Sequence, residues 1–178
     1  MTSINWQPDN LETEIVQLIP LSETDFERLF EVASDPLIWA QHPSSDRYKL
    51  DPFRSFFDEA IQGKSAFLII EKDTQKVIGS TRYYDYNPDN SSIAIGYTFL
   101  ARQYWGGLYN KSTKYLLLNY AFQYVDNVYL HIGGNNIRSQ VATTRIGAVK
   151  TKEFSIERNG QQALKFEYVI EKKNWTGV

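Results

Sequence analysis

Apolar residues recur along the chain with two different periods, and these periods predict a succession of strands and helices. Spacings of three or four residues predict amphipathic helices over 26–33, 51–61 and 108–125. Short apolar or alternating runs predict strands over 11–19, 66–71, 77–86, 92–100, 128–132, 148–157 and 163–170. The pair Asn135-Asn136 predicts the start of a further helix, which Gly147 ends.

Local signals mark several boundaries of these elements. Ser22-Glu-Thr-Asp25 resembles a capping box before the first helix, which should stop before Pro36. Asp51-Pro52 predicts the start of the next helix, after an irregular stretch over 37–50. Asn159-Gly160 predicts a tight hairpin between the last two strands.

The resulting order of elements is βααβββαβαββ, which predicts one α/β domain over residues 1–178 with a mixed sheet. The crossover through helix 108–125 makes strands 92–100 and 128–132 parallel neighbours, and hairpins make the other pairs antiparallel. Strict alternation in 92–100 places Ile93, Ile95, Tyr97 and Phe99 on one face. The other face carries Ala94, Gly96, Thr98 and Leu100. These side chains are small until the end of the strand, as if something packs close to them.

Composition narrows the chemistry of this domain. The 178 residues carry a net charge of −2, which argues against a nucleic-acid partner. The chain has no cysteine and two histidines, so a cysteine nucleophile and a three-histidine metal site are excluded, and no metal is expected. It shows no targeting signal and no apolar run long enough for a membrane span. We therefore expect a soluble cytoplasmic protein without a membrane partner.

Two stretches carry the candidate chemistry. The segment 99–110, FLARQYWGGLYN, joins a strand end to a helix start, and Gly106-Gly107 allows a tight turn with bare N–H groups beside the positive end of the helix. Such a turn can hold a phosphate or pyrophosphate, or it can be an ordinary strand–helix connection. The second stretch is Asn136-Ile-Arg-Ser139 followed by Gly147-Ala148, which by itself is typical of a capped helix.

Taken together, these two stretches and the order of elements resemble the GNAT acetyltransferases, most closely the branch of the ribosomal-protein N-terminal acetyltransferases. The resemblance runs from about Glu14 to Glu171. The family's first motif, Arg/Gln-x-x-Gly-x-Gly/Ala, falls on Gln103, Gly106 and Leu108, where Leu108 departs from the small residue expected. Asn110 and Lys114 match an Asn-x-x-x-Lys variant of this branch.

The resemblance implies a strongly twisted sheet of about six or seven strands with about four helices. Strands 92–100 and 128–132 splay apart and admit the pantetheine arm of acetyl-CoA, which is the co-substrate. The residues implied to bind it are Phe99, Leu100, Gln103, Trp105, Gly106, Gly107, Leu108, Tyr109, Asn110, Asn136 and Ser139.

The reaction implied is acetyl transfer to a primary amine, on a small molecule or a polypeptide N-terminus. Without a cysteine there is no acyl-cysteine intermediate, so transfer is expected to be direct, in a ternary complex. A backbone N–H near 98–100 can stabilise the oxyanion. Ser139 is the first candidate for protonating the departing thiolate, and Tyr97 and Tyr84 are alternatives.

The general base is missing from its usual place, because Ala94 stands where many family members carry Glu. Asp85 and His42 are candidates, although each is more typical of a solvated surface residue. Trp39, His42 and Tyr84 are predicted to line the acceptor pocket. His131 is predicted to be an ordinary residue of the sheet.

Three functions remain open from the sequence. The first is an acetyl-CoA-dependent N-acetyltransferase, with acetyl-CoA and an amine acceptor as partners. The second, kept open by Ala94, is a non-catalytic acyl-CoA-binding or sensing module. The third is a nucleotide- or phosphate-binding α/β domain. The chain is expected to be a monomer or a homodimer.

Overall fold

The computed structural model describes residues 4–158 and 160–177. Its strands are β1 (Leu11–Glu12), β2 (Val16–Pro20), β3 (Ala66–Glu71), β4 (Lys76–Asn87), β5 (Ser92–Leu100), β6 (Asn127–Gly133), β7 (Val149–Arg158) and β8 (Gln161–Glu171). Its α-helices are α1 (Phe26–Ala33), α2 (Pro36–Trp39), α3 (Leu50–Gly63), α4 (Leu108–Ala121) and α5 (Ile137–Arg145). Among these described residues, no helix is long and apolar enough to cross a membrane.

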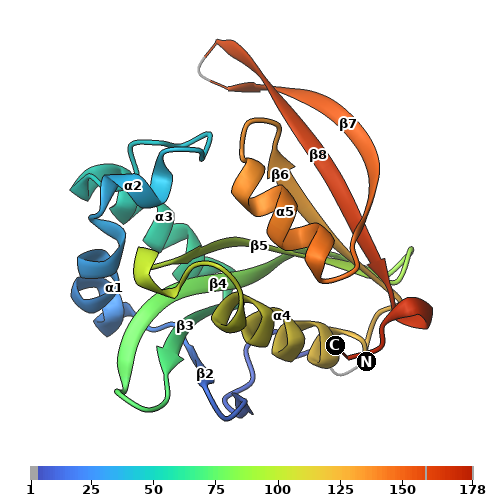
Figure 1. The fold of residues 1–178 in the computed structure, drawn as a ribbon, viewed down its shortest axis with the longest axis horizontal. Helices are drawn as coiled ribbons and strands as arrows, with labels where there is room; N and C mark the ends of the chain where they lie inside the picture. The colour runs from blue at the N-terminus through green and yellow to red at the C-terminus, as the bar shows by residue number, and fades with distance from the viewer. Residues whose placement is uncertain (1–3, 159, 178) are drawn as a thin grey trace.

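All eight strands belong to one mixed sheet in the order β1-β2-β3-β4-β5-β6-β8-β7 (Figure 1). Only the pair β5–β6 is parallel, as the crossover through α4 predicts. The last two strands form the predicted hairpin, paired as far as Arg158 and Gln161. Of the turn predicted between them, Asn159 lies outside the described residues.

The core has two parts, one on each face of the sheet. Strand β3 alternates between them: Phe67 and Ile69 face the cluster that includes α4, while Leu68 and Ile70 face the cluster that includes α1, α2 and α3. Because both faces are covered by helices, β3 is an almost continuous apolar run.

The two parallel strands separate soon after they begin. Pairing between β5 and β6 covers only Ser92 to Ala94 on β5 and Asn127 to Tyr129 on β6. Beyond Ala94 the strands diverge, and the start of α4 and the helix α5 lie on either side of the divergence (Figure 1). The predicted splay is therefore present, and it sets the position of the candidate site.

Strand β5 is irregular where the strands diverge. Gly96 pairs with Arg82 and Phe99 with Ser80, so Tyr97 and Thr98 stand opposite Thr81 alone. This is a β-bulge, and Tyr97 adopts a left-handed φ of 53°. The prediction of strict alternation was wrong from this point: Ile93 and Ile95 face one core cluster and Phe99 the other.

The numbers of strands and helices also differ from the expectation of about six or seven and about four. The predicted strand 11–19 is split into β1 and β2, because the Thr13 hydroxyl accepts hydrogen bonds from Ile15 N and Val16 N and turns the chain. The irregular stretch after Pro36 contains the short helix α2, which Asp35 caps by accepting a hydrogen bond from Leu37 N. The order of the remaining elements is as predicted.

The predicted helix starts were correct in part. The capping box at Ser22 and Asp25 is present, with Ser22 N donating to Asp25 Oδ2 at 2.8 Å. Helix α5 is capped by Asn136, as predicted. The predicted start of helix α3, with Asp51 as the cap and Pro52 as the first helical residue, was two residues late: the helix begins at Leu50, with Lys49 in the N-cap position.

Candidate functional site

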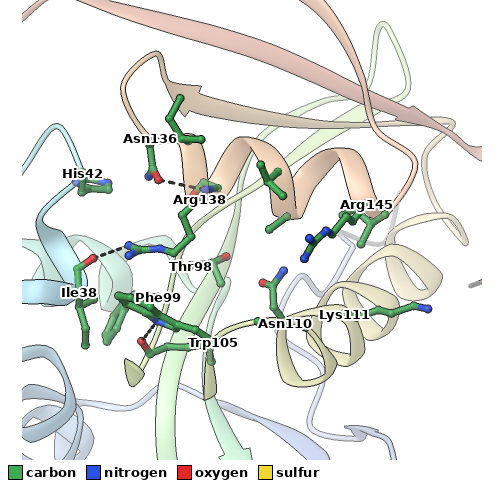
Figure 2. A pocket seen from close by; sticks show the side chains of 18 of the residues that line it. Ile38, His42, Thr98, Phe99, Trp105, Asn110, Lys111, Asn136, Arg138 and Arg145 are labelled. Atoms are coloured by element: carbon green, nitrogen blue, oxygen red, sulfur yellow. Dashed lines mark hydrogen bonds between the residues drawn. The ribbon is translucent and has the colours of Figure 1, made fainter. Parts of the chain in front are cut away.

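A cavity of about 550 Å³, here called the large cavity, lies where β5 ends and α4 and α5 begin (Figure 2). Nine of the residues predicted to bind the cofactor line it. They are Phe99, Leu100, Trp105, Gly106, Gly107, Leu108, Asn110, Asn136 and Ser139. The two sequence stretches that were singled out therefore meet at one cavity.

The turn at Gly106 and Gly107 has the conformation that its glycines suggest. The φ angles are 95° for Gly106 and 153° for Gly107, which other residues rarely adopt. A Cβ built on either glycine would find no other atom within 4 Å, so the turn is open. Gly107 is the N-cap of α4, and the backbone N–H groups of the first helical turn are available to an anion.

Three cationic side chains that the sequence analysis did not single out also line the large cavity. Lys111 stands on α4, and Arg138 and Arg145 stand on α5 (Figure 2). Together with the positive end of α4, they make the lining favourable for phosphate groups. The signal that could have revealed the two arginines is their spacing of seven residues, which places them on one face of a helix.

The same cavity has an apolar side formed by exposed aliphatic side chains. Leu108 is 63% exposed, Ile137 57% and Val141 42%. Large apolar side chains gathered on a concave surface are typical of ligand-binding sites. The lining thus combines a region for phosphates with a region for an apolar chain.

Trp105 and Arg138 connect the glycine turn to α5. The indole Nε1 of Trp105 donates to the Leu100 carbonyl at 2.9 Å, and the Arg138 guanidinium lies 3.8 Å from the centre of the indole ring. Arg138 also donates to the Ile38 carbonyl at 2.8 Å, as Figure 2 shows. The contact fixes Trp105 beside the end of β5.

Two residues predicted to bind the cofactor are placed elsewhere. Gln103 is exposed on the 3-10 helix Arg102–Tyr104 and is not among the described residues that line the cavity. The Tyr109 hydroxyl donates to Glu71 at 2.8 Å, and the Tyr104 hydroxyl donates to the same carboxylate at 2.9 Å. A hydrogen bond from the Thr74 hydroxyl, together with those from these two donors, lowers the pKa of Glu71. Tyr109 therefore anchors the turn to β3.

A smaller cavity of about 150 Å³, here called the small cavity, adjoins the large one at the bulge of β5. Its walls come from β5, β6, β8, α4, α5, the end of α2 and the segment between α2 and α3. Five of the predicted site residues line both cavities: Trp39, His42, Asn110, Asn136 and Ser139. Thr98 also lines both cavities, and the predicted Tyr97 lines the small cavity alone. Two ligands could therefore meet at Thr98 and Ser139.

The predicted acceptor residues differ in their surroundings. Trp39 belongs to the core and also lines both cavities. It is 3% exposed, and its Nε1 donates to the Ala33 carbonyl at 2.7 Å. His42 Nδ1 accepts from Ser44 N at 2.9 Å. The Arg82 guanidinium lies over the ring of Tyr97, with Arg82 Cζ 3.5 Å from the ring centre.

Two other predicted residues lie outside the described linings. Asp85 is exposed near the far end of β4, with a left-handed φ of 52°. The Tyr84 hydroxyl is bonded to His131 Nδ1 at 2.8 Å, and the ring fills the space beside Gly96. Burial raises the pKa of Tyr84 above its usual value. The structure therefore does not bring Asp85 and Tyr84 together with Ser139.

His131 has a more specific setting than an ordinary sheet residue. It lies on β6 and lines the small cavity, with Nδ1 bonded to Tyr84 and Nε2 at 3.4 Å from Glu167 Oε2. These bonds hold the imidazole in one orientation in the sheet.

Lys114 is the most unusual ionisable group of the site. Its residue is 5% exposed, and Nζ donates to Thr98 Oγ1 at 2.7 Å. Thr98 Oγ1 is in turn 2.8 Å from Thr81 Oγ1. Burial lowers the pKa of the Lys114 ammonium from its usual value of 10.5 to about 7. The sequence matched Lys114 to a motif without a role for it.

The charges around the small cavity have one sign. Its described lining contains no Asp or Glu, and it includes the basic side chains of His42, Arg47, Lys114, His131 and Lys165. Among the described residues there is also no group of three or more His, Asp or Glu side chains arranged to hold a metal ion. The small cavity therefore suits an anionic group.

Comparison with known proteins agrees with this geometry. A family model described as an acetyltransferase (GNAT) domain matches residues 16–149. No protein with a curated description matches the chain in the sequence search. Many solved structures share the fold.

Three of the similar structures illustrate the likeness. A GCN5-related N-acetyltransferase from Brucella melitensis has a TM-score of 0.78 at 20% identity, over 95% of this chain and 83% of that one. A Vibrio cholerae protein, provisionally assigned as a ribosomal-protein-serine acetyltransferase, has a TM-score of 0.74 at 16% identity, over 93% and 99%. The microcin C7 self-immunity acetyltransferase MccE, solved with acetyl-CoA and AMP, has a TM-score of 0.76 at 13% identity, over 95% and 99%. At these identities, the three structures establish the fold alone.

Proposed function

The chain belongs to the GNAT acetyltransferase family, and from that premise we propose that it transfers an acetyl group from acetyl-CoA to a primary amine. One observation carries the proposal: the open glycine turn at the start of α4 faces the large cavity, at the point where β5 and β6 diverge. This arrangement combines an anion site with an opening for an extended arm.

In the proposed complex, the pyrophosphate of acetyl-CoA lies at Gly106, Gly107 and the first turn of α4. Lys111 and Arg145 supply positive charge to the phosphates from the two helices that border the large cavity. The pantetheine arm runs beside Thr98 to Leu100 and extends the sheet at the edge that β5 exposes by diverging from β6. The exposed side chains of Leu108, Ile137 and Val141 cover its apolar parts.

The thioester then lies at the junction of the two cavities. A backbone N–H of the segment 98–100 stabilises the oxyanion that forms when the amine attacks the carbonyl carbon. Ser139, which lines both cavities, protonates the departing thiolate. Transfer is direct because the chain has no cysteine to carry the acetyl group. Tyr97 forms a wall of the small cavity, and Asp85 has no part in the proposal.

The acceptor amine enters through the small cavity. Its described lining is basic and contains no carboxylate, so a polyamine would meet repulsion there. An acceptor with a carboxylate or a phosphate near its amine would be attracted. We therefore favour an anionic amine, such as an amino acid or an acidic polypeptide N-terminus, as the substrate class.

A thermal-shift titration with acetyl-CoA, CoA, ATP and NAD tests the cofactor assignment. Acetyl-CoA and CoA should stabilise the protein by ~2.7 kcal/mol at about 100 times their dissociation constant. ATP and NAD should give a much smaller shift at equal concentration. If no CoA species shifts Tm at millimolar concentration, the assignment fails. A preference for ATP or NAD would favour a nucleotide-binding domain instead.

A further inference from the structure

One buried ionisable group of the small cavity has no role in the reaction as described so far. Lys114 is on α4, the helix that begins at the glycine turn, and it is 5% exposed. Few lysines are buried to this degree, because an ammonium loses its hydration there. The cost suggests that the amine serves a purpose that an apolar residue could not.

The position of Lys114 links it to the reacting atoms of the proposed transfer. Its Nζ is 2.7 Å from the hydroxyl of Thr98, a residue of the β5 bulge that lines both cavities. Lys114 itself lines the small cavity, in which the acceptor amine is placed. Only the Thr98 side chain therefore separates the Lys114 amine from the backbone segment at which the thioester is placed.

The surroundings of Lys114 favour its neutral form. Thr98 and Thr81 form the only hydroxyl chain that is described beside Nζ. The other titratable groups that line the small cavity come from β5, β6, β8 and the segment after α2: they are Tyr97, His131, Lys165, His42 and Arg47. None of these is a carboxylate, so none of them favours the charged ammonium. The lowered pKa of about 7 agrees with this setting.

A proton acceptor is required because a free alkylamine is mostly protonated near neutral pH. The resemblance places the usual carboxylate at position 94, where this chain has a buried alanine. A buried lysine is a documented alternative, since desolvation brings its pKa into the range of a general base. We propose, on the basis of the acetyl transfer above, that Lys114 is the general base that deprotonates the acceptor amine.

The proposed step conserves atoms and charge. The amine nitrogen forms a bond to the thioester carbonyl carbon, and the carbon–sulfur bond of acetyl-CoA breaks. An acceptor that enters as an ammonium gives up two protons: Lys114 Nζ takes the first before the attack and releases it to solvent, and it takes the second from the nitrogen as the amide forms. That proton then reaches the CoA sulfur with the Ser139 hydroxyl as the relay, so that Lys114 ends neutral and ready for another cycle. The products are the N-acetyl amine and CoA.

The protonation state of Lys114 can be measured without any knowledge of the acceptor. Protein labelled with ¹³C at the lysine side chains is titrated by NMR between pH 5.5 and 10, and Lys114→Arg identifies the resonance. We expect one lysine to titrate near pH 7 and to be absent from the variant. If every lysine titrates above about pH 9, Lys114 is an ordinary ammonium and the proposal is overturned.

The catalytic role is tested with the best acceptor from an amine panel. The kcat of the wild type should rise through an apparent pKa near 7, and Lys114→Met and Lys114→Arg should each lose at least about 100-fold in kcat and lose that inflection. Both variants should keep the acetyl-CoA thermal shift, which separates loss of the base from loss of the cofactor site. The exposed Lys173→Met is the matched control and should behave as wild type.

Two results contradict the assignment. One is a Lys114→Met variant with kcat within about threefold of the wild type. The other is a Lys114→Arg variant that keeps full activity, because a guanidinium cannot act as a base at these pH values. If acetyl-CoA binds but no amine is acetylated, the proposed function fails, while the NMR titration still decides whether Lys114 is neutral.

Discussion

Single residues of the site divide into those whose spacing revealed them and those that only the structure revealed. Gly106, Gly107 and Ser139 were predicted because glycine turns and capped helices leave a recognisable pattern, and all three line the large cavity. Lys111 was not singled out, and Lys114 was matched to a motif but given no role, because a lysine in a helix usually faces solvent. Their importance depends on burial and on neighbours distant in sequence, such as Thr98.

The buried amine of Lys114 should have a cost in stability that depends on pH. Its pKa is about 7 in the folded chain and near 10.5 when exposed, so the unfolded state binds more protons between these values. Stability of the wild type should therefore rise from pH 7 to pH 10 on account of this group. Lys114→Met, which removes the buried charge, should raise Tm by at least about 3 °C at pH 6.

The comparison that checks this is the difference in Tm between Lys114→Met and wild type, measured at pH 6 and pH 9.5. The difference should shrink at the higher pH, because most of the wild-type penalty is relieved there. A variant less stable than the wild type at pH 6 would show that the amine stabilises the fold, contrary to this account.

At the scale of elements, hydrophobic patterning identified every long helix and strand, and the errors have local causes. The turn at Thr13 and the short helix at Pro36 depend on hydrogen bonds of one side chain each. The bulge of β5 could not be foreseen, because Tyr97 is not a residue type that favours a left-handed φ. The bulge contains Thr98, whose hydroxyl accepts from Lys114, so the error fell on a position that the proposed mechanism uses.

The turn before α4 should need glycine for two reasons: its backbone conformation and the space that its ligand occupies. Gly107→Ala places a Cβ on a residue with φ of 153°, in the open space where a phosphate would lie. We expect a loss of acetyl-CoA affinity of at least about tenfold in isothermal titration calorimetry, which corresponds to ~1.4 kcal/mol.

A matched control separates strain from binding in this experiment. Gly160, in the β7–β8 turn, also has a positive φ of 73° with no atom within 4 Å of a built Cβ. Gly107→Ala and Gly160→Ala should each lower the free energy of unfolding by ~1 kcal/mol, but Gly160→Ala should leave the affinity for acetyl-CoA unchanged. Equal affinities for both variants and the wild type would mean that the glycine turn does not contact the cofactor.

At the scale of the whole molecule, the distribution of charge matters more than its sum. The chain carries a net charge of −2, yet the described lining of the small cavity is basic. The composition alone therefore could not indicate the acceptor, since the residues concerned come from separate parts of the sheet and from the segment after α2. The parallel pairing of β5 and β6 was predicted from the crossover through α4, and their divergence was predicted from the resemblance to the GNAT family.

The central claim is acetyl transfer to an anionic amine, and a turnover assay tests it most directly. Release of free thiol from acetyl-CoA is followed with amino acids, their carboxamide analogues, acidic peptides and polyamines, and mass spectrometry identifies each N-acetyl product. We expect turnover with an anionic amine, at least about tenfold better in kcat/KM than with its neutral analogue. The account would be contradicted if acetyl-CoA binds but none of these amines raises the rate of thiol release above the rate of acetyl-CoA hydrolysis without an amine.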